Sequence, residues 1–174
     1  DDILSADARK QVADVLAAVR SSTSVQCPDG KERSFQVGVA LVRHMHPDDW
    51  VSGSKEDTAK AFAQELGDRW GVGDPGCDNG ALLFLSLGDR FAYVKTAKTS
   101  QQVLTDHLST TVVDNMKPLL RDGRYDDAVL QAVLQIHDVL SGKQIPGASS
   151  SWSDLAGGLI VCAVLAVYTL PVLT

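Results

Sequence analysis

The sequence predicts a mixed α/β fold, a three-layer α/β/α sandwich with a small mixed sheet, followed by one C-terminal transmembrane helix. Helical and strand patterns alternate along residues 5–142. The run ALLFLSL at residues 81–87 is almost entirely apolar, which is typical of a central strand. Residues 155–174 carry no charged side chain. We therefore expect a globular domain and a separate membrane element.

Length and composition fit one globular domain with a small additional element. The chain has 174 residues, of which 44% are hydrophobic and 22% charged, and this balance is typical of a folded domain. The formal net charge is -6. Because lysine and arginine do not cluster anywhere, a nucleic-acid partner is not expected. The first residue is Asp1 rather than methionine, which indicates a processed mature form or a trimmed chain.

The N-terminal part predicts a helix, a polar loop and a strand. A helix is expected over residues 5–20, with Ser5 placed to cap its start. Its apolar stripe consists of Ala8, Val12, Val15, Leu16 and Val19. Residues 21–33 are polar and contain proline and glycine, so a loop is expected. In residues 35–42 apolar positions alternate with small or apolar ones, which predicts a strand covered on both faces.

A second helix, a glycine loop and a hairpin are expected next. The helix covers residues 55–70, and Ser54 followed by Asp57 resembles a capping box. Residues 71–80 form a loop rich in glycine and aspartate. After the central strand, a two-residue turn of glycine and aspartate leads into a returning strand over residues 91–96.

Two further helices complete the expected domain. The third begins at Ser100 or Gln101 and runs to about Met116, where Pro118 interrupts or kinks it. The fourth covers residues 126–140, and the glycine two positions later is well placed to end it.

The element order determines which loops share an end of the sheet. Strand, helix, strand implies a right-handed parallel crossover, so Cys27 and Cys77 enter neighbouring strands at one rim. We expect a Cys27–Cys77 disulfide, which requires an oxidising compartment; the alternative is two free thiols sharing a rim by chance. Cys162 is expected to stay reduced. His44 and His46 lie at the opposite rim, where a solvated loop is favoured over a zinc or copper site.

Three aspartates suggest a cation site at the cysteine rim. Asp74, Asp78 and Asp106 could supply carboxylate oxygens for Ca²⁺, and a glycine-rich loop adds backbone carbonyls. The alternative is that aspartate and glycine are ordinary turn residues. No serine–histidine–acid set, P-loop or Rossmann fingerprint stands out, so no catalytic residue is assigned.

Residues 155–174 predict the membrane anchor. Twenty uncharged, mostly apolar residues span about 30 Å as a helix, which matches the hydrocarbon core of a bilayer. A buried core helix and a GPI-anchor signal are the alternatives. Gly158, Cys162 and Ala166 lie four apart and form a stripe of small residues of the kind that packs helices in lipid. The expected organisation is a soluble domain at residues 1–142, a linker at 143–154 and this anchor.

The longest specific motif is RWGVGDPGCDNGALLFLSLGDR, and a second follows in LTDHLSTTVVDNMKPLLRDGRYDDAVLQAV. The first motif rests on Trp70, Gly71, Val72, Gly73, Asp74, Asn79, Gly80, Asp89 and Arg90. The second rests on Leu104, Asp106, Pro118, Arg121, Gly123 and Tyr125. On these residues the chain resembles the TPM domain family over about residues 5–142, and the resemblance implies an α/β/α sandwich. Many members carry a threonine-glycine-x-glycine stretch after the third strand. Here it is Thr96-Ala97-Lys98-Thr99, which weakens the transfer of a catalytic role.

The resemblance implies three functions. Several members are accessory factors of membrane complexes, some are described as acid phosphatases, and some bind calcium. We expect a non-enzymatic, membrane-anchored accessory, assembly or modulatory subunit of an integral membrane complex, associated with a photosystem, a receptor or a channel. Its domain is expected on the non-cytosolic side, with the thylakoid lumen favoured over the secretory lumen or cell surface. A metal-dependent acid phosphatase and a Ca²⁺-binding module are the alternatives.

Overall fold

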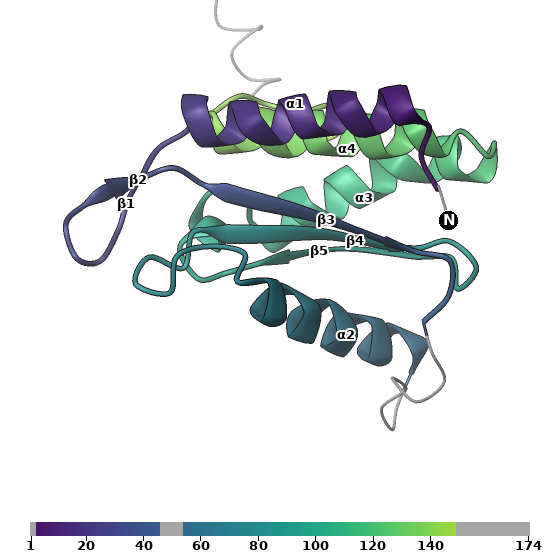
Figure 1. Cartoon of the computed structure of the whole chain (residues 1–174), viewed down its shortest axis with the longest axis horizontal. Coiled ribbons are helices and arrows are strands. Elements are labelled where there is room, and N and C mark those ends of the chain that lie inside the picture. Colours follow the sequence, from purple (N-terminus) through teal and green to yellow (C-terminus); the bar gives the residue numbers. More distant parts are fainter. Residues whose placement is uncertain (1–2, 46–53, 149–174) are drawn as a thin grey trace, which may run out of the picture.

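Helices cover both faces of a three-stranded mixed sheet in the computed structural model, which describes residues 3–45 and 54–148 (Figure 1). One helix lies against one face and three lie over the other, so the sheet is the middle of three layers (Figure 1). The elements are α1 (Ala6–Ser22), β1 (Val25–Gln26), β2 (Glu32–Arg33), β3 (Gln36–Val42), α2 (Lys55–Trp70), β4 (Gly80–Ser86), β5 (Phe91–Thr96), the short 3-10 helix η2 (Ser100–Gln102), α3 (Asp106–Arg121) and α4 (Tyr125–Leu140).

The sheet has the order β3-β4-β5, with the apolar strand in the centre. Strands β3 and β4 are parallel, with Gln36 opposite Gly80. Strands β4 and β5 are antiparallel, with Ala81 opposite Thr96. Every residue of β4 is buried, as a continuous apolar run predicts for a strand covered on both faces. The predicted parallel pair and antiparallel hairpin are confirmed.

The two faces of β4 build two separate cores. Leu83 and Leu85 belong to the larger core beneath α1, α3 and α4. Leu82 and Phe84 belong to the smaller core beneath α2, where the Phe62 and Phe84 rings lie 5.3 Å apart. Successive side chains of a strand point to opposite faces, so one apolar run anchors both helical layers.

The predicted starts of the first two helices are confirmed by their caps. The Ser5 hydroxyl accepts a hydrogen bond from the Ala8 N–H at 3.2 Å. At α2 the Ser54 hydroxyl accepts from the Asp57 N–H, and the Asp57 carboxylate accepts from the Ser54 N–H, each at 3.1 Å. This reciprocal pair is a capping box with aspartate in the usual glutamate position. Gly71 ends α2 in the left-handed conformation, with φ of 61°.

Three details differ from the sequence prediction. The loop at residues 21–33 contains the small antiparallel ribbon β1–β2. Helix α3 begins at Asp106 because Thr105 caps it, accepting from the Leu108 N–H, and only the 3-10 turn η2 forms before that point. The helix also continues through Pro118 rather than stopping there. Leu119 and Leu120 pack against the larger core, which favours this extra turn.

Within the described residues, no helix is long and apolar enough to cross a bilayer. The predicted span at residues 155–174, with its stripe of Gly158, Cys162 and Ala166, lies outside the described residues. His46 of the predicted histidine pair also lies outside them.

Candidate functional site

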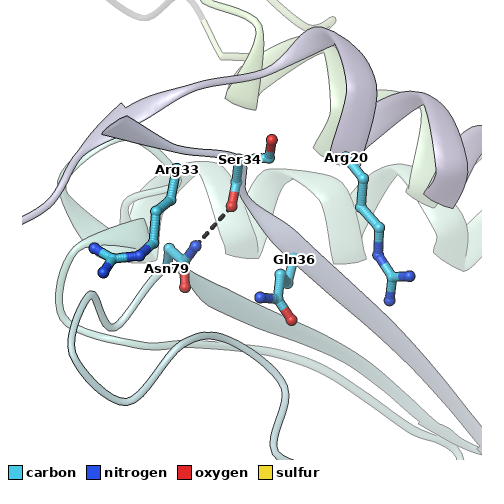
Figure 2. Close-up of a pocket in the computed structure, with 5 residues that line it drawn as sticks. All are labelled: Arg20, Arg33, Ser34, Gln36 and Asn79. Atoms are coloured by element: carbon cyan, nitrogen blue, oxygen red, sulfur yellow. Dashed lines mark hydrogen bonds between the residues drawn. The ribbon is translucent and has the colours of Figure 1, made fainter. Parts of the chain in front are cut away.

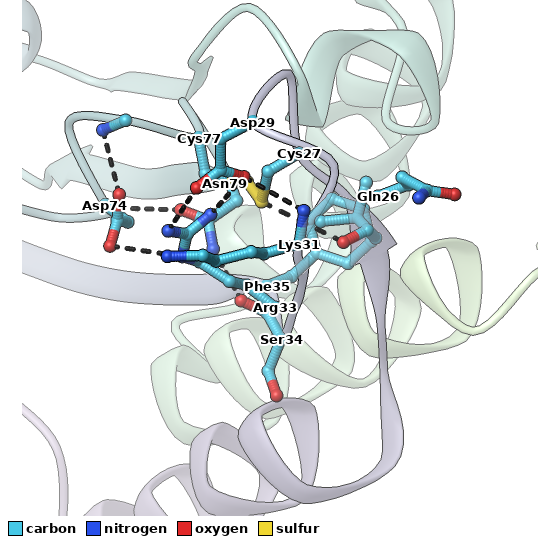
Figure 3. Close-up of a disulfide and its surroundings, with 12 residues drawn as sticks. Gln26, Cys27, Asp29, Lys31, Arg33, Ser34, Phe35, Asp74, Cys77 and Asn79 are labelled. Atoms are coloured by element: carbon cyan, nitrogen blue, oxygen red, sulfur yellow. Dashed lines mark hydrogen bonds and ion pairs between the residues drawn. A yellow bond between two sulfur atoms is a disulfide. The ribbon is translucent and has the colours of Figure 1, made fainter.

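A disulfide joins two loops at the end of the sheet where β3 and β4 begin (Figure 3). Cys27 follows β1, and Cys77 lies in the glycine loop between α2 and β4. Their Cα atoms are 4.8 Å apart, and both side chains are buried. The predicted Cys27–Cys77 bond is confirmed. It ties the β1–β2 ribbon to the glycine loop across 50 residues of sequence.

Asn79 fixes the same loop from inside. Its side chain is buried, with 1% exposed. The Asn79 Nδ2 donates to the Ser34 carbonyl at 2.6 Å, and its Oδ1 accepts from the Asp74 N–H at 2.7 Å (Figure 3). The Gln36 N–H donates to the Asn79 carbonyl at 3.0 Å. The Asn79 side-chain amide and backbone carbonyl therefore hold the glycine loop onto the start of β3. The buried amide is hydrogen-bonded at both ends, as is usual for buried polar groups.

Arg33 links the ribbon to the loop through two carboxylates. Its two terminal nitrogens donate to the Asp29 oxygens at 2.9 and 2.8 Å, and its Nε lies 3.4 Å from an Asp74 oxygen (Figure 3). The Arg33 hydrogen bonds, followed by the Lys31 N–H, lower the pKa of Asp29 from 3.8 to about 2. The hydrogen bonds to Asp29 in turn raise the pKa of Arg33. Such bidentate contacts fix orientation as well as charge.

Two of the predicted calcium ligands, Asp74 and Asp106, already bind other groups of the protein. One Asp74 oxygen accepts from the Gly76 N–H at 2.8 Å, and the other faces Arg33. The Asp106 carboxylate accepts from the Gln101 side-chain amide at 2.9 Å.

Asp78 takes part in the rim through its backbone. It adopts a positive φ of 53°, and its carbonyl accepts from the Thr99 and Ser100 N–H groups. Asp74, Asp78 and Asp106 do not form a metal-binding cluster, since the described residues include no group of three histidine, cysteine, aspartate or glutamate side chains placed to hold a metal ion. Calcium binding stays a prediction.

An open cavity of about 520 Å³ lies beside this rim (Figure 2). Its lining consists of Arg20, Arg33, Ser34, Gln36 and Asn79. The sequence motifs singled out only Asn79 among these. Arg20, Arg33 and Gln36 follow no recognisable pattern, and the only available signal was that Arg33 and Gln36 flank the entry to the first strand, close to the Cys27 loop.

A serine, a histidine and an aspartate meet where α1 and α4 end, although the sequence did not mark them. The Ser22 Oγ lies 2.9 Å from the His137 Nε2, and the His137 Nδ1 lies 3.6 Å from an Asp138 oxygen. However, Ser22 donates its only hydroxyl proton to the Ala18 carbonyl at 2.7 Å. With that proton on the Ala18 carbonyl, the Ser22–His137 contact is not the serine-to-histidine donation of a catalytic pair.

The surroundings of that trio also oppose nucleophilic catalysis. Both helices end there, and a helix C-terminus presents unsatisfied carbonyls rather than the N–H groups that stabilise an oxyanion. We interpret these three residues as a structural contact that joins the ends of α1 and α4.

Asp89 organises the opposite rim. One of its oxygens accepts from the Ser86 hydroxyl at 2.6 Å and from the Met45 N–H at 2.7 Å. The Ser86 hydrogen bond, followed by that from Met45, lowers the Asp89 pKa below its ordinary value. His44 lies beside it, with Nδ1 3.8 Å from the other oxygen. The hydrogen bond from the Met45 N–H to Asp89 holds the segment after β3 against the β4–β5 turn. The aspartate of the aspartate-arginine motif therefore has a structural role.

These features define a small mixed α/β domain with a disulfide-stapled rim and a polar cavity beside it. The family model of the TPM domain matches residues 30–139. The chain belongs to the TPM domain family, as its motifs predicted. A search of curated protein sequences finds no match.

Solved structures share the same fold. The N-terminal domain of a protein from P. gingivalis superposes with a TM-score of 0.61 at 24% identity, covering 80% of this chain and 78% of that one. The BA42 protein from the psychrophilic bacterium Bizionia argentinensis gives 0.62 at 14% identity, with coverages of 82% and 84%. The N-terminal domain of the cg2496 protein from Corynebacterium glutamicum gives 0.51 at 13%, with 86% and 78%. At these identities the likeness concerns the fold alone.

Proposed function

We propose that this protein is a non-enzymatic accessory or modulatory subunit of a larger integral membrane complex. Its TPM domain would sit on the non-cytosolic side, and residues 155–174 would anchor it beside the partner. The observation that carries the proposal is that reactive groups of the disulfide rim already bind other groups of the protein. Asp74 is occupied by Arg33 and by the Gly76 N–H, and Cys77 is locked in a disulfide. Groups that could perform chemistry instead hold a surface rigid.

A rigid surface suits docking because little conformational freedom is lost when a partner binds. In the described part of the chain, the glycine loop is held by a disulfide, a buried amide and an ion pair. A metal-dependent phosphatase would need the same carboxylates free to hold a cation and activate water. The rim is therefore better suited to binding a partner than to hydrolysis.

The disulfide supports the proposed compartment. Stable disulfides form in oxidising environments and are rare in the cytosol. The thylakoid lumen, the secretory lumen and the cell exterior all meet this condition, so a photosystem, a receptor or a channel complex would each fit as the partner.

The anchor stripe provides the test of this function. Gly158→Leu combined with Ala166→Leu should release the full chain from its complex, because leucine prevents the close helix approach that small residues permit. Ala156→Leu is the matched control for Ala166→Leu, since it makes the same change about 160° away from Gly158 on an ideal helix. The measurement is native electrophoresis of gently solubilised source membranes.

The wild type and Ala156→Leu should migrate within one large complex, and the double variant should migrate as the free chain. The proposal fails if the wild type itself migrates as the free chain. It also fails if the double variant stays in the complex.

A further inference from the structure

The cavity beside the disulfide rim is lined by hydrogen-bond donors and lacks an acidic side chain among its lining residues. The chain as a whole carries a formal net charge of -6. Figure 2 shows Gln36 between Arg20, which comes from the last turn of α1, and Asn79 with Arg33 on the other side. The local chemistry is thus opposite in sign to that of the whole chain.

Arg20 supplies a positive charge that no other described residue pairs with. Its side chain makes no ion pair or hydrogen bond within the described residues, whereas Arg33 is neutralised by Asp29 and Asp74. A guanidinium offers five N–H donors in a planar fork that matches the oxygens of a carboxylate or phosphate. Arg20 is the group most able to receive an oxyanion here.

Gln36 adds a neutral donor. The Gln36 Oε1 accepts from the Gly73 N–H at 3.4 Å, and this contact leaves the Nε2 of the same amide to donate elsewhere. Ser34 also lines the cavity, and its carbonyl accepts from the Asn79 Nδ2. Asn79 offers little further, because both ends of its amide already bond to the backbone. Asn79 instead holds the wall of the cavity in place.

We propose that this cavity binds an oxyanion, a carboxylate or a phosphate group, with Arg20 as the charged contact and the Gln36 Nε2 as a hydrogen-bond donor. Its volume of about 520 Å³ lies within the range of small-ligand sites. The wall is preorganised by the Asn79 and Arg33 contacts, which reduces the entropy lost on binding. The site is independent of the proposed docking role, since a small anion can bind whether or not the chain joins a complex.

The test is a titration of the ¹⁵N-labelled full chain in neutral detergent micelles, followed by amide chemical shifts. One arm uses inorganic phosphate and the other an N-acetylated tri-glutamate peptide. Arg20→Gln should weaken saturable binding about tenfold, the effect of losing one charge-assisted contact. Gln36→Glu keeps the acceptor for Gly73 but adds a negative charge, so it should abolish binding. Lys10→Gln is the charge-matched control, about 15 Å away along α1.

The expected result is saturation with shifts concentrated at residues 20, 34 and 36, and less than a twofold effect of Lys10→Gln. Tighter binding of the peptide assigns the site to the carboxylates of an acidic partner, and tighter binding of phosphate assigns it to a phosphate group. Either preference supports the site. The absence of saturation with both probes up to about 20 mM, or equal weakening by Lys10→Gln and Arg20→Gln, overturns it.

Discussion

Replacing Cys27 and Cys77 together with alanine is expected to lower the free energy of unfolding by about 4 kcal/mol. The bond links residues 50 apart, and closing a loop of that size restricts the unfolded chain by this amount in the chain-entropy model. Small domains are stable by roughly 5–15 kcal/mol in total, so the loss is a large share. Alanine is preferred to serine because both positions are buried, and a buried hydroxyl would add its own cost.

Denaturant unfolding of the oxidised wild type, the reduced wild type and the double variant measures this effect. The reduced wild type and the variant should unfold at similar midpoints, well below the oxidised protein. Cys162→Ala is the control, because that cysteine is predicted to stay reduced. Equal midpoints for the oxidised and reduced wild type would contradict the structural role of the bond.

Gly80→Ala is expected to destabilise the domain by about 3 kcal/mol, the upper part of the range for overpacking. A Cβ at this position would collide with the Val72 carbonyl. The Val72 backbone has little room to move, because its N–H donates to the Gly67 carbonyl at the end of α2. Gly80 itself is fixed as the first residue of β4, where its carbonyl accepts from the Ala97 N–H.

Gly76→Ala is the matched control from the same loop. A Cβ there would approach only the Asp74 Oδ1, at 3.2 Å, and that atom belongs to a side chain. The control should change stability by less than about 1 kcal/mol. Denaturant midpoints compare the two variants. If Gly80→Ala is as stable as Gly76→Ala, the close contact between Val72 and Gly80 does not constrain the loop.

Much of the fold follows from local patterns. The run at residues 81–87 identified the central strand, and the Ser54–Asp57 capping box placed the start of α2 at the correct residue. These signals work because they depend on neighbours in sequence. The β1–β2 ribbon was missed because each strand has two residues, too few to show alternation. The start of α3 was placed too early because the Thr105 cap overrides the apolar pattern that precedes it.

The site was only partly predictable because its contacts join residues that lie far apart in the sequence. The disulfide could be predicted because topology alone brings Cys27 and Cys77 to one rim. The ion pair between Arg33 and Asp74 could not, since 41 positions separate these residues and no motif connects them. That pair occupies a carboxylate that the sequence had suggested for calcium. A charged residue's partner is decided by tertiary packing, and composition carries no record of it.

The central claim is that the disulfide rim binds rather than catalyses. Its most direct test is the hydrolysis of a generic phosphate ester by the oxidised full chain, with Ca²⁺, Mg²⁺ and Mn²⁺ supplied in turn, alongside Asp74→Asn. We predict that each metal leaves the rate at that of buffer alone, for the wild type and the variant alike. Metal-dependent turnover by the wild type that Asp74→Asn abolishes would contradict this account and assign the rim to phosphatase chemistry.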